Sequence, residues 1–90
     1  MEKLWLPSTM EILHEDGINK FTLTRKECIP LELKLNVSSK GRLWSHIGTI
    51  LFEFATERPN ALTSITLTDA QYEFVLMLMG KRSWEECKGL

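Results

Sequence analysis

The clearest pattern of hydrophobic and polar residues lies in the middle of the chain and is typical of an amphipathic helix. Apolar residues recur there at intervals of three and four, which places them on one side of a helix, and polar residues fill the other side. The apolar positions are Leu43, Trp44, Ile47, Ile50, Leu51, Phe54 and Ala55. Gly48 and Phe52 interrupt the pattern. We predict a helix from about Leu43 to Glu57 that ends before Pro59, since a residue that precedes proline avoids the α region.

Two segments alternate apolar and polar residues, which is the pattern of a β-strand with one face in water. Residues Leu31–Val37 carry leucine or valine at every second position. Pro30 stands at the start of this segment, where a missing N–H does least harm to a strand. Residues Thr63–Leu67 alternate in the same way. We therefore predict strands at both segments, joined by a right-handed crossover if they are parallel neighbours.

The segment around Asp16-Gly17 has two interpretations, of which a β-hairpin is the favoured one. Asp-Gly is a strong signal for a two-residue hairpin turn. Such a turn would pair Ile12 with Phe21 and Met10 with Leu23. Both pairs then fall on one face of the hairpin, as a half-buried hairpin requires.

The second interpretation of the same segment is a short helix. Ser8 would be its N-cap, Glu11 would complete a capping box, and Gly17 would end it. The sequence leaves this alternative open.

The last third of the chain predicts another helix. Thr68 and Gln71 have the spacing of a capping box, and Gly80 provides a stop signal. Residues Ser83–Glu86 repeat the capping pattern for a final short turn. The predicted order is ββ-β-α-β-α in one domain over residues 1–90. The expected fold is α+β, with a small mixed sheet of three or four strands and two helices packed on one face.

Composition and charge exclude several classes of function. The net charge of the 90-residue chain is −1 and its isoelectric point is about 6.1. Binding to nucleic acid is unexpected because it needs a basic surplus on one face, and so is binding to an anionic membrane. The start of the chain is too short and too polar for a signal peptide, so we expect a cytoplasmic protein with free thiols at Cys28 and Cys87.

The residues that could carry catalysis or bind a metal are scattered. The chain has two histidines and two cysteines, but their spacings do not match the close ligand pairs of structural zinc sites. There is no nucleophile motif of a hydrolase and no phosphate-binding loop of a nucleotide enzyme. We therefore expect neither an enzyme nor a bound cofactor or metal.

One loop has the composition of an anion site. The segment Ser38-Ser39-Lys40-Gly41-Arg42 precedes the long predicted helix, and Ser38 or Ser39 would cap that helix. Free N–H groups, hydroxyls and two cations at such a position could hold a phosphate. A binding module for an anionic ligand such as a nucleotide is therefore the alternative function, with residues Ser38, Ser39, Lys40, Gly41 and Arg42 as its site.

Aromatic residues beside the main helical stripe point to a different function. Phe52 and Trp44 belong to the long predicted helix, and Trp84 lies near the end of the chain in a charged context. Aromatic residues are enriched at protein interfaces. We expect a small non-enzymatic inhibitor, adaptor or regulator that occludes a larger protein partner, forms a homodimer, or does both. Chains of this kind are often encoded by phages or mobile elements.

Overall fold

The computed structural model describes residues 7–80, which fold into a three-stranded sheet and a layer of helices. The elements in chain order are β1 (Thr9–His14), β2 (Lys20–Thr24), α1 (Arg25–Val37), the 3₁₀ helix η1 (Gly41–Trp44), α2 (Ser45–Ala55), β3 (Ser64–Leu67) and α3 (Asp69–Leu78).

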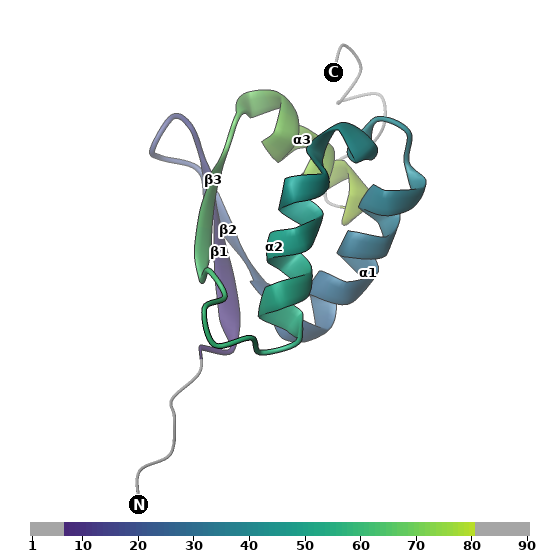
Figure 1. The fold of residues 1–90 in the computed structure, drawn as a ribbon. Helices are drawn as coiled ribbons and strands as arrows, with labels where there is room; N and C mark the ends of the chain where they lie inside the picture. The colour runs from purple at the N-terminus through teal and green to yellow at the C-terminus, as the bar shows by residue number, and fades with distance from the viewer. Residues whose placement is uncertain (1–6, 81–90) are drawn as a thin grey trace, which may run out of the picture.

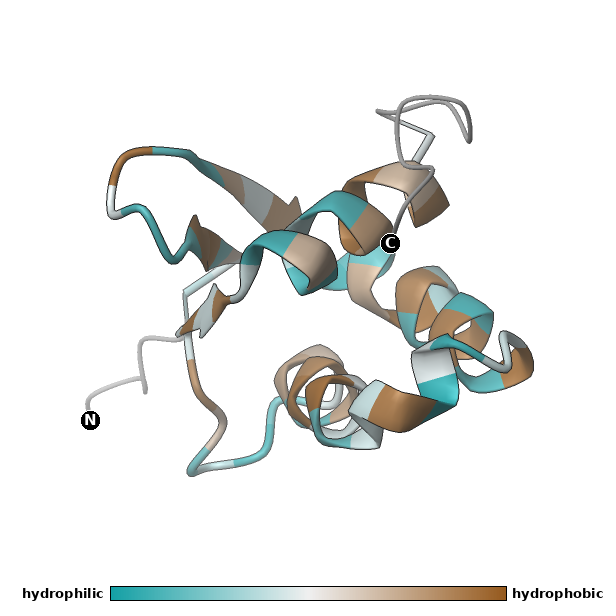
Figure 2. Ribbon diagram, turned by 90° about the horizontal axis from the view of Figure 1, so that it is seen from above, coloured by the Kyte–Doolittle hydropathy of each residue, from teal (hydrophilic) through white to brown (hydrophobic). Residues whose placement is uncertain are grey.

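The sheet has the strand order β2-β1-β3 and is mixed. β1 pairs antiparallel with β2 and parallel with β3. The helices lie on one side of this sheet (Figure 1), and the two layers are also visible from above in Figure 2. The predicted α+β class, with helices packed on one face of a small mixed sheet, is therefore confirmed.

The hairpin interpretation of the first segment is confirmed, and the helical alternative is wrong. Ile12 pairs with Phe21 and Met10 pairs with Leu23, as the Asp-Gly turn predicts. The turn is wider than two residues, because the Asp16 carboxylate accepts hydrogen bonds from the N–H groups beyond Gly17. The two acceptor distances from Asp16 Oδ1 are 2.7 Å to the amide nitrogen of residue 18 and 3.0 Å to that of residue 19.

The predicted strand at Leu31–Val37 is wrong, because these residues form the second half of α1. The helix begins earlier, at a capping box between Thr24 and Glu27. The Thr24 hydroxyl accepts from the Glu27 N–H, and the Thr24 N–H donates to Glu27 Oε1 over 2.8 Å. Pro30 is tolerated inside this helix. The observed order is therefore ββ-αα-β-α, and the strand that lies parallel to β3 is β1.

The long helix predicted from Leu43 to Glu57 is present but shorter. Its first turn is the 3₁₀ helix η1, and α2 proper ends at Ala55. Glu57 then adopts a left-handed conformation with φ of 56°, which terminates the helix before Pro59. The helix predicted after Thr68 is confirmed together with its capping box to Gln71.

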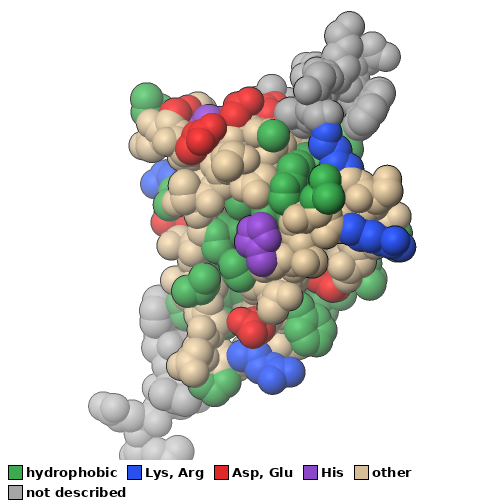
Figure 3. All heavy atoms as spheres, turned by 45° about the horizontal axis from the view of Figure 1, so that its top comes forward, with side chains coloured by type: hydrophobic (Ala, Val, Ile, Leu, Met, Phe, Trp, Pro, Cys, Tyr) green, Lys and Arg blue, Asp and Glu red, His purple; other side chains and the backbone are tan. Residues whose placement is uncertain are grey.

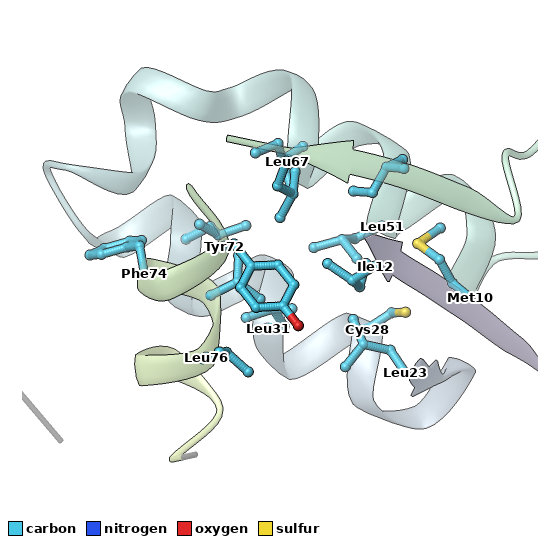
Figure 4. Packing of buried hydrophobic residues seen from close by; sticks show 14 of the residues in the cluster. Met10, Ile12, Leu23, Cys28, Leu31, Leu51, Leu67, Tyr72, Phe74 and Leu76 are labelled. Atoms are coloured by element: carbon cyan, nitrogen blue, oxygen red, sulfur yellow. The ribbon is translucent and has the colours of Figure 1, made fainter. Parts of the chain in front are cut away.

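The core lies between the sheet and the helices, and each element contributes the side chains of one face (Figure 4). β1 contributes Met10 and Ile12, α1 contributes Cys28, Leu31 and Leu35, and α2 contributes Ile47, Leu51 and Phe54. The opposite face of the sheet carries exposed polar residues such as Thr22 and Thr66. The protein therefore has two layers, with one face of the sheet in water.

Arg25 joins three parts of the fold at the lower end of the sheet. Its guanidinium donates to the backbone oxygen of Pro7 over 2.6 Å and to the backbone oxygen of Phe54. It also stacks 4.1 Å from the centre of the Phe54 ring and lies 3.8 Å from the Glu57 carboxylate. The start of β1, the start of α1 and the end of α2 are thereby held together by one side chain.

We predict opposite effects from alanine at two glycines of the helical layer. A Cβ on Gly41 would lie 2.5 Å from the Leu35 backbone oxygen, so Gly41→Ala should lower the free energy of unfolding by about 1–3 kcal/mol. A Cβ on Gly48 would lie 3.7 Å from Glu32 Cγ, an ordinary contact. Gly48→Ala should raise the free energy of unfolding by about 0.5–1 kcal/mol, because glycine is unfavourable inside a helix. Urea unfolding of both variants tests this, and a stable Gly41→Ala protein would contradict the tight turn.

Candidate binding surface on the helical layer

The outer side of α1, which faces away from the sheet, carries a row of apolar side chains. Ile29, Leu33 and Val37 follow one another at intervals of four residues, so they share one face of the helix. Their exposed fractions are 45%, 56% and 79%. The inward face of the same helix is also apolar, so α1 is hydrophobic on two opposite sides.

Phe52 on α2 is also exposed, with an exposed fraction of 43%. It lines a shallow groove between α1 and α2 together with Glu32, Asn36, Ser45, Gly48 and Thr49. Gly48 forms the buried floor of the groove, since it has no side chain to fill the space. Phe52 therefore points away from the sheet. The two irregular positions of the helical pattern both belong to this groove.

Trp44 is only partly buried and packs on α3. Its ring contacts the Phe74 ring edge to face, with 5.4 Å between the ring centroids and an angle of 72°. Such a pair stabilises the contact between η1 and α3. Trp84, the third aromatic residue predicted to bind a partner, lies outside the described residues.

The loop Ser38–Arg42 links α1 to η1, and the backbone N–H groups of Ser38, Gly41 and Arg42 donate within the loop or to the end of α1. The Gly41 N–H donates to Ser38 Oγ over 3.2 Å, and the Arg42 N–H donates to the Ser38 backbone oxygen over 3.0 Å. Arg42 Nε donates to the backbone oxygen of Asn36 over 3.2 Å. This arrangement closes the turn between the helices.

The N–H groups of Gly41 and Arg42 are therefore already used within the loop and would not be available to an anion. Ser39 is exposed and Lys40 is half-buried. Side chains on a short turn provide less preorganised binding than backbone N–H groups do. The anion-binding hypothesis stays a prediction.

A second polar cluster surrounds His14 at the end of β1. His14 Nε2 lies 2.9 Å from Asp69 Oδ1, and His14 Nδ1 accepts the N–H of Asp16 over 2.9 Å. The His14 ring also packs edge to face on Tyr72, and Glu15 accepts the N–H of Asp69. Figure 3 shows acidic side chains gathered around a histidine at the upper edge of the molecule. The cluster joins the hairpin turn to the first turn of α3.

Sequence reasoning missed the His14 cluster. His14 and Asp69 are separated by 55 positions, and no local motif links them. The signal is topological, because the parallel pairing of β1 with β3 places His14 opposite Leu67, two residues before Asp69.

The other cysteine and histidine in the described part of the chain lie apart from the His14 cluster, Cys28 in the core and His46 on the surface of α2. Cys28 is a free thiol in the core, and burial raises its pKa to about 11, so the thiolate is disfavoured. His46 is exposed on α2. Within residues 7–80 there is no cluster of three or more histidine, cysteine or acidic side chains that could hold a metal ion. Within the same range, no helix is both long enough and apolar enough to span a bilayer.

The chain matches no protein-family model, no curated protein and no solved structure.

We predict that His14 makes stability depend on pH. The hydrogen bond with Asp69, helped by the negative charges of Asp16, Asp69 and Glu15, raises the pKa of His14 above its ordinary value of 6.5. Folding then favours the protonated imidazole, whose Nδ1–H gives up the bond from the Asp16 N–H and faces Asp16 Oδ1 at 3.3 Å instead. This contribution is present below pH 6.5 and is lost as pH rises through the higher pKa of the folded state.

Urea unfolding at a series of pH values measures this effect. His14→Gln retains an amide that can bond to Asp69 but does not titrate, so the decline in stability above pH 6.5 should flatten in this variant. An unchanged slope would show that other groups cause the decline.

A separate loss of stability is expected in acid, because hydrogen bonds from the N–H groups of Ile18 and Asn19 lower the pKa of Asp16 from 3.8 to about 2.

Proposed function

We propose that this chain is a non-enzymatic protein-binding domain that acts as an inhibitor, adaptor or regulator by occluding a larger protein. Its binding surface is the outer face of the helical layer, defined by Ile29, Leu33, Val37 and Phe52. The observation that carries the proposal is the exposed apolar row on α1, which the fold does not use.

The distribution of exposed apolar side chains supports this assignment. Single exposed hydrophobic residues are normal on a protein surface, whereas a contiguous row is typical of an interaction site. Seven large hydrophobic side chains are exposed within the described residues, and five of them belong to α1, η1 or α2. These five are Ile29, Leu33, Val37, Leu43 and Phe52.

The polar surroundings of the groove fit an interface with an apolar centre. Glu32 and Asn36 line one side, and Ser45 and Thr49 line the other. Protein interfaces combine buried apolar anchors with a polar rim that keeps partners in register. Phe52 is the largest apolar side chain in the groove and is the expected anchor.

The proposal is tested with the double variant Leu33→Ser/Phe52→Ser and the matched control Ile18→Ser. Ile18 is 81% exposed in the loop that joins β1 to β2, outside the helical layer. A tagged full chain is used to capture a partner from a host lysate, and the identified partner is then titrated against each variant. Each serine at an anchor should cost about 2 kcal/mol of binding, or about thirty-fold in Kd, so the double variant should bind roughly several hundred-fold more weakly.

The same substitutions should change the free energy of unfolding little, since these side chains are exposed. Ile18→Ser should bind as tightly as the unchanged protein. Unchanged binding of the double variant, or an equal loss in the control, would refute this surface. Failure to capture any stoichiometric partner would count against the function itself.

A further inference from the structure

The outer edge of β3 has backbone groups that take no part in the sheet. β3 is a terminal strand of the sheet and is the strand nearest the viewer in Figure 1. The Thr63 backbone oxygen accepts from the Glu11 N–H over 2.9 Å. This hydrogen bond shows which residues of β3 direct their backbone groups toward β1. Because bonding direction alternates along a strand, the N–H and C=O groups of Ser64 and Thr66 point away from β1.

Apart from the short length of β3, which has four residues, the sequence of this edge lacks the features that normally prevent strand pairing. Natural edge strands are protected by charged residues, prolines or bulges. Residues Thr63–Thr68 are threonine, serine, isoleucine and leucine, so they combine high β propensity with no charge and no proline. The other edge strand, β2, carries the exposed cation Lys20 and runs directly into α1.

We propose that two copies of this chain pair through their β3 edges to form a continuous six-stranded sheet. A two-fold symmetric pair of strands is necessarily antiparallel, and the same edge serves both copies. If Ile65 lies opposite Ile65 of the second copy, Ser64 of each copy lies opposite Thr66 of the other copy. All the outward N–H and C=O groups of Ser64 and Thr66 are then satisfied.

The side-chain pattern is compatible with this register. Ile65 and Leu67 point to the helical side of the sheet and are buried, whereas Ser64 and Thr66 lie on the exposed face. The pairing therefore extends the apolar side of one sheet into the apolar side of the other, and the polar side into the polar side. A sheet of six strands also has a common size for globular proteins.

The dimer is independent of the proposed partner surface and adds to it. The β3 edge and the outer face of α1 belong to different layers, so pairing leaves Leu33 and Phe52 accessible. A dimer carries two copies of the helical surface, which raises avidity for a partner with repeated sites.

The test compares Thr66→Pro with Thr22→Pro in the full chain. Both threonines are exposed, and both have N–H groups that point to an open edge, Thr66 on β3 and Thr22 on β2. Proline removes that N–H without removing a hydrogen bond to β1. We expect the unchanged protein and Thr22→Pro to show twice the monomer mass of 10.4 kDa in sedimentation equilibrium. The dissociation constant of the Thr66→Pro dimer should be at least ten-fold higher than that of the unchanged protein.

Several outcomes would overturn the proposal. These are a monomeric unchanged protein at concentrations up to about 1 mM, a dimer that survives Thr66→Pro, and dissociation by Thr22→Pro alone. If circular dichroism shows that Thr66→Pro is unfolded, Thr66→Lys replaces it, because a charge on the edge opposes pairing and leaves the backbone intact. A persistent Thr66→Lys dimer then contradicts the pairing. Loss of partner binding without loss of the dimer concerns only the helical surface.

Discussion

All the helices of the described chain must bury their apolar side on the same face of one small sheet. Three strands offer room for few side chains, and β1, at the centre, supplies Met10 and Ile12 as the base of the core. α1 packs Cys28, Leu31 and Leu35 against this base, and α2 packs the side chains of its inward face there. A domain of this size buries a modest share of its surface, so each of these contacts matters for stability.

This constraint explains why α1 has apolar residues left over. Once Leu31 and Leu35 face the sheet, the helical period turns Leu33 and Val37 to the opposite side. α2 is next to α1 and cannot cover that side, so the row on α1 and Phe52 in the groove remain accessible. The proposed partner surface therefore follows directly from which side chains of α1 and α2 pack into the core. The β3 edge is accessible because an open sheet of three strands has two terminal strands, and β3 is one of them.

The parts of the fold that the sequence predicts are those with local signals. The hairpin register follows from Asp16-Gly17 and from the period of two, and α3 follows from its capping box. Residues 31–37 were assigned wrongly because alternating leucines satisfy two patterns. They form one face of a strand, but they also form two opposite faces of a helix. The capping box between Thr24 and Glu27 was the signal that distinguishes them.

The candidate sites were predictable to different degrees. Phe52 and Gly48 stood out as irregular positions, and both line the groove. The contact of His14 with Asp69 depends on the parallel pairing of β1 with β3, which no local pattern encodes. The N–H groups of Gly41 and Arg42 in the Ser38–Arg42 loop donate to Ser38, an arrangement that depends on how the chain turns between the two helices.

The central claim is that α1 buries one apolar side and exposes the other, and methyl accessibility tests it most directly. A soluble paramagnetic probe added to methyl-labelled protein should broaden the NMR signals of Leu33 and Val37 and spare those of Leu31 and Leu35. A strand over the same residues would place the methyl groups of all four residues on one face. Equal protection of Leu33 and Leu35, in protein without a bound partner, would contradict the account.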